Sequence, residues 1–198
     1  MSKFKGLAIV GRKCSGKDTI VDHILKHYPD SFEVVRCKQP IVDAFEQDRH
    51  ENDKISIRDD VPMRPYTKTD DLSLIKFSKG FLKRNPLAIT LHIDRSIRSC
   101  EDREIFALIP DIRLLSQLTT AIFSRIFILK LKVPEYTLRQ RCLSRDGNLD
   151  AFLPNDISES GIADFPSNLT ITNEDFHLDS TFHKVNSVLF DLTGSYGG

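Results

Sequence analysis

The segment from Gly6 to Leu25 reads GLAIVGRKCSGKDTIVDHIL. The continuous apolar run Gly6–Val10 predicts a strand that is buried on both faces. Apolar residues at helical spacing predict a helix that begins at Lys17 and ends near His27. Between the two lies G-x-x-x-x-G-K, from Gly11 to Lys17. In this strand-loop-helix context, that spacing is the Walker A pattern of a phosphate-binding loop.

Each residue type in this loop has a chemical reason to be there. The glycines let the backbone curl so that its N–H groups face a phosphate, and the start of the helix adds its dipole. We expect Lys17 to bridge the β- and γ-phosphates of a nucleotide, and the remaining contacts to come from Gly11, Lys13, Cys14, Ser15, Gly16 and Thr19. Asp18 stands where the pattern usually has the Ser or Thr that holds Mg²⁺, so we assign it to the metal shell. The alternative is a chance loop with helix-capping residues.

Four further strand-like runs follow, at 32–37, 104–109, 125–133 and 169–172. Helices are predicted at 71–82, 86–98 and 177–192, and the alternation of strands with helices indicates an α/β layered fold with a parallel sheet. We treat residues 1–198 as a single domain with two interruptions. One is a charged insertion at about 48–103. The other is a lid at about 139–166, which is rich in turn-forming residues.

A second carboxylate is expected near the loop. The strand-like run that ends at Ile109 continues into Pro110-Asp111-Ile112-Arg113. Ligands of open α/β sheets collect at the carboxyl ends of strands, so Asp111 is a candidate for a second metal contact. Arg113 is a candidate for binding a substrate phosphate through its guanidinium group. The alternative is a helix N-cap role for Asp111 and a solvated Arg113.

Phosphoryl transfer needs several cations, because negative charge spreads over the transferring oxygens. Arg141 and Arg145 are one helical turn apart at the start of the lid, so we expect both to reach the phosphates from one face of a helix. Arg36 and Lys76 are candidates for the acceptor pocket. The alternative for each of these residues is a solvated surface charge.

The composition excludes several classes of protein. Twenty-eight basic residues balance 28 acidic ones, so the net charge is zero, which argues against a nucleic-acid coat and a polybasic membrane anchor. No apolar run approaches the length of a membrane span, and we expect a cytoplasmic protein. The four cysteines, Cys14, Cys37, Cys100 and Cys142, are far apart in the sequence. We therefore expect free thiols rather than a disulfide framework or a zinc site.

The motifs together resemble those of a family. Ser15-Gly16-Lys17-Asp18-Thr19 and Pro110-Asp111-Ile112-Arg113 resemble the S-G-K-D-T loop and the P-D-x-R motif of the phage-type deoxynucleoside monophosphate kinases. Animal-type phosphomevalonate kinases, with an S-G-K-D loop and a D-T-R-R motif, look similar. Ser158-Glu159 and Ile171-Thr172-Asn173 are similar to the lid-end and adenine-loop motifs of both groups.

This resemblance implies a three-layer α/β/α P-loop NTPase fold with a five-stranded parallel sheet. It also implies ATP and Mg²⁺, and transfer of the γ-phosphoryl group to a small acceptor that already carries a phosphate. Asp18 and Asp111 would lie in the metal region, and Asn173 would lie at the adenine edge. The catalytic group would be Lys17, Asp111, Arg113, Arg141 and Arg145.

The residues and the resemblance lead to three candidate functions. The first is phosphorylation of a nucleoside monophosphate, and the resemblance to the first group favours the deoxy form. Phosphomevalonate is the second, although Leu114 departs from the doubled Arg of that line and Lys76 stands where its members use Arg. The third is a catalytically silent P-loop protein that binds nucleotide or acts as a scaffold. It is motivated by Glu174-Asp175, which replaces the small residue after the adenine-loop Asn.

Overall fold

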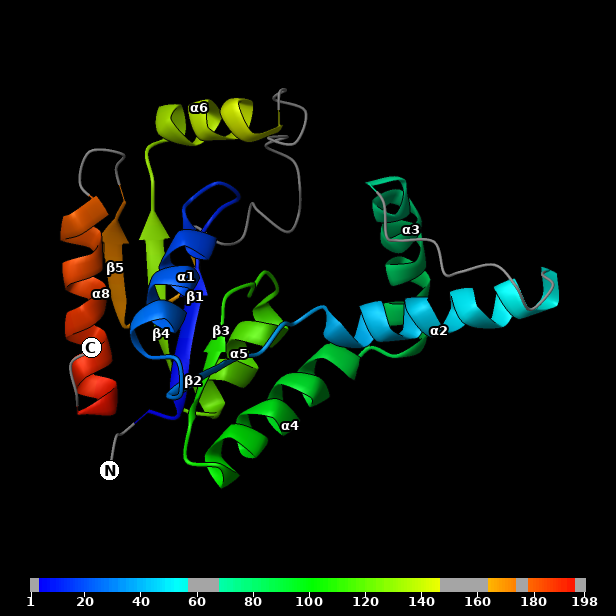
Figure 1. Cartoon of the computed structure of the whole chain (residues 1–198), viewed down its shortest axis with the longest axis horizontal. Helices are drawn as coiled ribbons and strands as arrows, with labels where there is room; N and C mark the ends of the chain where they lie inside the picture. Colours follow the sequence, from blue (N-terminus) through cyan, green and yellow to red (C-terminus); the bar gives the residue numbers. More distant parts are fainter. Residues whose placement is uncertain (1–3, 57–67, 147–163, 174–177, 195–198) are drawn as a thin grey trace. The chain divides into compact units, whose positions relative to one another are not determined.

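Five parallel strands form a single sheet in a computed structural model that describes residues 4–56, 68–146, 164–173 and 178–194 (Figure 1). The strands are β1 (Gly6–Val10), β2 (Phe32–Val34), β3 (Phe106–Ile109), β4 (Ile126–Lys132) and β5 (Leu169–Thr172). Their order in the sheet is β2-β3-β1-β4-β5. The predicted five-stranded parallel sheet is confirmed.

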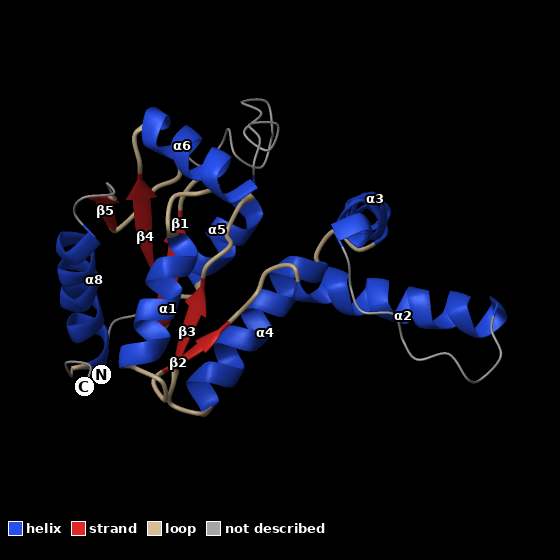
Figure 2. Ribbon diagram, turned by 45° about the horizontal axis from the view of Figure 1, so that its top comes forward, coloured by secondary structure: helices blue, strands red, loops and turns tan. Residues whose placement is uncertain are grey.

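Helices cover both faces of this sheet, as Figure 2 shows. On one face, α1 (Lys17–His27) and α8 (Leu178–Thr193) bury Ile24 and Leu189 against Leu7 and Ile9 of β1. On the other face, α5 (Leu115–Phe123) packs against β4. Every residue of β1 is buried, which explains why this strand reads as a continuous apolar run.

The parallel register places the end of β1 at the same edge of the sheet as the end of β3. Ala8 of β1 lies beside Ile109 of β3, and Val10 lies beside Lys130 of β4. The loop that follows β1 and the segment that follows Ile109 therefore leave the sheet at one edge. This is the edge at which ligands of open α/β sheets bind.

Several predicted elements have different ends in the structure. β3 begins at Phe106 rather than at Glu104, and β4 begins at Ile126 rather than at Arg125. Glu104 and Arg125 both have a φ of 57°, a left-handed conformation that a strand does not contain. Two predicted helices are longer than expected: α3 spans Lys68–Arg84 and α4 spans Ala88–Asp102.

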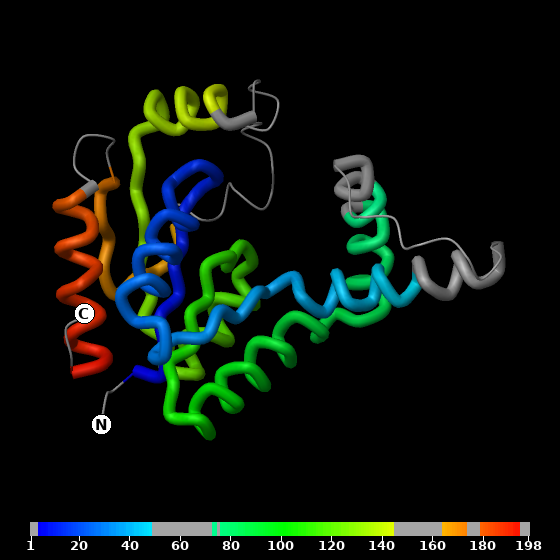
Figure 3. Tube along the Cα trace, viewed as in Figure 1, coloured from blue at the N-terminus to red at the C-terminus, as the bar shows by residue number. Residues whose placement is uncertain are grey.

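The chain divides into two compact units, one of residues 1–36 with 93–198, which holds the sheet, and one of residues 37–92. In the second unit, shown in cyan and green in Figure 3, α2 (Gln39–Ser56) packs against α3. The rings of Phe45 and Phe77 are 5.4 Å apart between centroids at this contact. This unit differs in its bounds from the insertion expected at 48–103.

Among the helices in the described ranges, none combines the length and the apolar character that crossing a membrane requires.

Candidate functional site

The loop between β1 and α1 curls through two left-handed residues. Cys14 has a φ of 62° and Gly16 has a φ of 89°. The Ser15 N–H donates to the Arg12 carbonyl oxygen at 3.1 Å, and the Ile20 N–H donates to that of Gly16 at 3.1 Å, which begins α1. A tight turn of this kind followed by a helix start is the backbone form that the Walker A pattern predicts.

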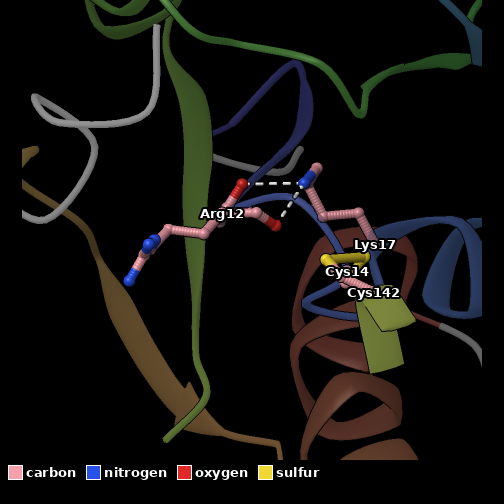
Figure 4. The surroundings of a disulfide bond; sticks show 5 residues. Arg12, Cys14, Lys17 and Cys142 are labelled. Carbon is pink, nitrogen blue, oxygen red and sulfur yellow. Dashed lines mark hydrogen bonds between the residues drawn. A yellow bond between two sulfur atoms is a disulfide. The ribbon is translucent and has the colours of Figure 1, made fainter. Parts of the chain in front are cut away.

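Lys17 holds this curl from inside the loop. Its Nζ donates to the carbonyl oxygens of Gly11 at 2.7 Å and of Arg12 at 2.9 Å, as the dashed lines in Figure 4 show. A Cβ on Gly11 would lie 2.5 Å from the Ser15 Oγ, so this position has no room for a larger residue. The ammonium group is thus kept beside the concave side of the loop.

Asn173, at the end of β5, supports the loop from the other side. Its side chain is buried, and its Nδ2 donates to the Ser15 carbonyl oxygen at 2.8 Å. Its Oδ1 lies 3.5 Å from the Oγ1 of Thr181, which is also buried. These contacts position the loop backbone. The adenine-edge role expected of Asn173 stays a prediction.

A cavity of about 480 Å³ opens in front of the loop. Five cationic side chains and two carboxylates line it together with small and polar loop residues. The full lining is Lys13, Cys14, Ser15, Gly16, Lys17, Asp18, Thr19, Arg36, Pro110, Asp111, Arg113, Arg141 and Asn173. A chain with zero net charge therefore gathers a surplus of positive charge in one cavity, which suits a polyanionic ligand.

The segment after β3 is held by a residue that sequence reasoning missed. Gln117, in the first turn of α5, is buried, and its Oε1 accepts the N–H groups of Arg113 at 2.7 Å and of Leu114 at 3.0 Å. Leu114 is the N-cap residue of α5, so the alternative N-cap role for Asp111 does not hold. A Gln three residues after a helix start is a known capping signal and was a usable clue.

Helix α6 (Glu135–Asp146) contributes Arg141 to the cavity. The helix start is tied to the loop, because Arg12 Nη1 lies 3.1 Å from Glu135 Oε2. Arg139 also pairs with Glu135, at 3.0 Å, so this arginine forms a surface ion pair on its own helix. Hydrogen bonds from Arg12 and then from Arg139 lower the pKa of Glu135 below its ordinary value.

The expectation of free thiols was wrong for two of the four cysteines. Cys14 of the loop and Cys142 of α6 form a disulfide, with their Cα atoms 5.8 Å apart (Figure 4). The two residues are 128 positions apart in the sequence, so spacing gave no sign of the pair. Only the packing of α6 beside the loop brings their side chains together. Cys37 and Cys100 are buried and are not part of a disulfide, which agrees with the expectation for these two residues.

Two predicted site residues, Gly11 and Lys76, are not among the described residues that line the cavity, and a third, Arg145, is not described there. Gly11 lies at the base of the loop and offers its carbonyl oxygen to Lys17. Lys76 is exposed on α3, in the unit of residues 37–92. Arg145 lies on α6, but its side chain and the lid residues 147–163 fall outside the described parts of the chain.

The two carboxylates of the cavity fit a magnesium ion by their chemistry. Asp18, at the start of α1, and Asp111, after β3, both line the cavity and supply hard oxygen donors. Mg²⁺ is usually held by one or two carboxylates together with waters and substrate phosphates. The part of the chain that the structure describes has no group of three or more His, Cys, Asp or Glu side chains placed to hold a metal.

The sheet order, the flanking helices and the loop define a P-loop α/β fold. TT1252 from Thermus thermophilus shares this fold with a TM-score of 0.63 at 17% sequence identity, over 96% of this chain and 98% of that one. A sugar kinase from Janibacter sp. HTCC2649 shares it with a TM-score of 0.51 at 13% identity, over 96% of each chain. No protein-family model matches this chain, and no curated protein matches its sequence.

Proposed function

We propose that this protein is an ATP-dependent phosphotransferase that moves the γ-phosphoryl group of ATP to a small acceptor that already carries a phosphate. The acceptor that the residues favour is a nucleoside monophosphate, in its deoxy or ribo form. The observation that carries the proposal is the composition of one cavity. It combines a Walker A loop with two arginines from other elements, Arg36 and Arg113.

The loop between β1 and α1 would bind one polyphosphate, that of ATP. Backbone N–H groups at the start of α1 and the ammonium of Lys17 offer donors and positive charge on the concave side of the loop. When ATP is bound, we expect Lys17 to leave the carbonyl oxygens of Gly11 and Arg12 and to bind phosphate oxygens. Arg141 faces the same cavity from α6 and would neutralise charge that develops on the transferring group.

Arg36 and Arg113 would bind a second anion in the cavity, the phosphate of the acceptor. A loop that binds only one nucleotide has no need for two guanidinium groups from the segments that follow β2 and β3. A planar guanidinium binds a phosphate through two parallel hydrogen bonds, which also orients it. Because Gln117 fixes the backbone at Arg113, this side chain starts from a defined position.

Asp18 and Asp111 would hold Mg²⁺ beside the phosphates. The bound ion would supply charge neutralisation at the β- and γ-phosphates. Asp18 stands next to a polyanion site, where an uncompensated carboxylate would repel the ligand, and this is the physical reason to place a cation there.

Two other functions remain as alternatives. Phosphomevalonate is a second acceptor that carries a phosphate and suits the same arginines. A catalytically silent protein that binds nucleotide or acts as a scaffold would use the loop without transferring phosphate. Because a sugar kinase shares the fold, unphosphorylated sugars belong among the acceptors to be tested.

The first experiment measures ADP formation from ATP and Mg²⁺ with a panel of nucleoside monophosphates, deoxynucleoside monophosphates, phosphomevalonate and sugars. We expect turnover with a nucleoside monophosphate. Turnover with another acceptor alone would replace the substrate assignment. ATP-dependent thermal stabilisation without turnover on any acceptor would support the silent protein, and absence of both would overturn the proposal.

Two variants test the roles of the cavity residues. Lys17→Ala should abolish the thermal shift by ATP, whereas Lys26→Ala, on the exposed side of the same helix, should keep it.

Arg113→Ala should raise the KM of the acceptor by about tenfold or more, the effect of losing a charge-assisted hydrogen bond, with the Kd of ATP nearly unchanged. Arg98→Ala, which removes an exposed arginine of α4, is its control. Equal loss of ATP binding in Arg113→Ala would contradict the acceptor role.

A further inference from the structure

The disulfide joins two parts of the proposed active site that the sequence holds far apart. Cys14 is the middle residue of the phosphate-binding loop and lines the cavity. Cys142 is buried in α6 and directly follows Arg141, which lines the same cavity. Figure 4 shows the bond beside Lys17 and the loop backbone that Lys17 holds. The crosslink is therefore built into the place where phosphates would bind.

We propose that Cys14 and Cys142 form a reversible redox-modification site, and that the disulfide strengthens phosphate binding in the cavity. A dithiol reductant is the class of reagent that this site would take. The inference rests on the proposed function, because it concerns the binding of ATP at the same loop.

The first argument for coupling is the conformation of the loop. Cys14 has a φ of 62°, which is unfavourable for a residue with a Cβ, so its left-handed form must be held by its surroundings. The disulfide bond to Cys142 holds the side chain of Cys14 against α6. When the bond is broken, the loop is freer to leave the curled form in which its N–H groups face the cavity.

The second argument is the position of Arg141. Cys142, which follows Arg141 in α6, is bonded to Cys14 of the loop. The turn of α6 that carries Arg141 is therefore held beside the loop. Among the described residues, the ion pair between Arg12 and Glu135 also joins this helix to the loop, but both side chains are substantially exposed to solvent. Exposed ion pairs contribute little and are screened by salt. Reduction would therefore loosen the turn that brings Arg141 to the cavity.

Reduction follows ordinary thiol-disulfide exchange, and the structure indicates which sulfur is attacked. Cys14 is partly exposed at the cavity, whereas Cys142 is fully buried. A thiolate of the dithiol attacks Sγ of Cys14, the bond between Cys14 and Cys142 breaks, and Cys142 leaves as a thiolate and takes up a proton. The second thiolate of the reductant then attacks its own sulfur in the mixed disulfide and releases Cys14. Two electrons pass to the protein, and the dithiol becomes a cyclic disulfide.

The positive charge of the cavity favours this exchange. Lys13 and Lys17 flank Cys14 in the loop, and Arg141 lines the same cavity. A thiolate is the form of the reductant that reacts, and positive charge attracts this anion to the cavity. The same residues that would bind phosphate thus lie beside the sulfur of Cys14 that the reductant attacks.

The test compares ATP binding by oxidised and reduced protein in the full chain. The protein is equilibrated with glutathione disulfide or with dithiothreitol, its free thiols are counted after unfolding, and the Kd of ATP is measured by calorimetry at fixed Mg²⁺. We expect two free thiols in the oxidised form and four in the reduced form. We also expect ATP binding to weaken by about tenfold on reduction, the scale of one charge-assisted hydrogen bond, and to recover on reoxidation.

Variants separate this site from other effects of the reagents. Cys142→Ser should bind ATP as the reduced protein does under both conditions. Cys100→Ala, which removes a free buried cysteine, should keep the response to reduction. Four free thiols in the oxidised sample, or equal ATP affinity in both forms, would overturn the redox inference and leave the proposed function in place. If neither form binds ATP while the thiol counts are as expected, the proposed function fails instead.

Discussion

At the scale of single residues, the curled shape of the phosphate-binding loop depends on two residues in the left-handed conformation, Cys14 and Gly16. Gly16 adopts its φ of 89° without steric cost because it has no Cβ. A Cβ at Gly16 would also lie 2.5 Å from Nδ2 of Asn173, the atom that holds the Ser15 carbonyl oxygen. The second glycine of the motif is therefore required both by the backbone and by the support behind it.

Gly16→Ala should lower the free energy of unfolding and abolish ATP-dependent thermal stabilisation. The left-handed conformation alone costs a residue with a Cβ about 1–2 kcal/mol, and the clash with Asn173 adds to this. Urea unfolding and thermal shift with ATP measure the two effects.

Gly80→Ala is the matched control for this substitution. Gly80 lies within α3, and a Cβ there meets nothing within 4 Å. The control should stabilise the protein by about 0.5–1 kcal/mol through helix propensity. If both variants behave alike, the strained loop does not explain the requirement for glycine at position 16.

At the scale of elements, α6 is joined to the loop at two points. Its first residue, Glu135, pairs with Arg12, and Cys142 near its other end is bonded to Cys14. Arg141 is thereby presented to the cavity by a helix that is anchored on either side of it. The ion pair is the weaker and pH-dependent tie, whereas the disulfide depends on redox conditions.

The pKa of Glu135 provides a test of the weaker tie. Because hydrogen bonds from Arg12 and Arg139 lower this pKa, the contribution of the pair to stability is present above the ordinary value of 4.5 and is lost as the pH falls through the lowered value. A carboxyl-carbon NMR titration should therefore give a midpoint below 4.5 for Glu135.

Arg12→Ala should raise that midpoint more than Arg139→Ala does, because the hydrogen bond from Arg12 is the larger cause of the shift. The difference in stability between the wild type and Glu135→Gln should disappear at a pH below the midpoint. An unchanged midpoint in Arg12→Ala would show that the tie is not formed in solution.

At the scale of the whole molecule, charge and covalent connection are both unevenly distributed. The chain has no net charge, yet five cationic side chains and only two carboxylates line one cavity. The disulfide spans 128 residues of sequence and joins the first loop of the fold to a helix that follows the fourth strand. The compact unit that holds the sheet is therefore closed by a crosslink as well as by its core.

Reduction should lower the global stability of the protein. In the chain-entropy description, a crosslink stabilises by restricting the unfolded chain, and a loop of 128 residues contributes about 5 kcal/mol, at the upper end of the range of about 0–5 kcal/mol for disulfides. The urea concentration at the unfolding midpoint of the wild type should be lower in dithiothreitol than under oxidising conditions. The midpoint of Cys142→Ser should change little between the two conditions. Equal midpoints of the wild type under both conditions would show that the crosslink does not form or does not constrain the unfolded chain.

Much of the fold follows from local patterns in the sequence. The bounds predicted for the first and last strands, Gly6–Val10 and Leu169–Thr172, are those of β1 and β5. Continuous apolar runs mark strands that are covered on both faces, and this signal is local. The strand starts at Phe106 and Ile126 were missed because they depend on left-handed turns at Glu104 and Arg125, which composition does not reveal.

The sequence by itself determined the P-loop and its place between a strand and a helix, because the spacing of glycines and lysine is set by the phosphate chemistry of one short segment. Only the tertiary structure decided which distant residues meet this loop. Asn173 reaches the loop from the end of β5 and Cys142 reaches it from α6, and no periodicity records such contacts. The disulfide shows the reason most clearly: cysteines 128 positions apart become neighbours only when parallel strands bring their loops to one edge.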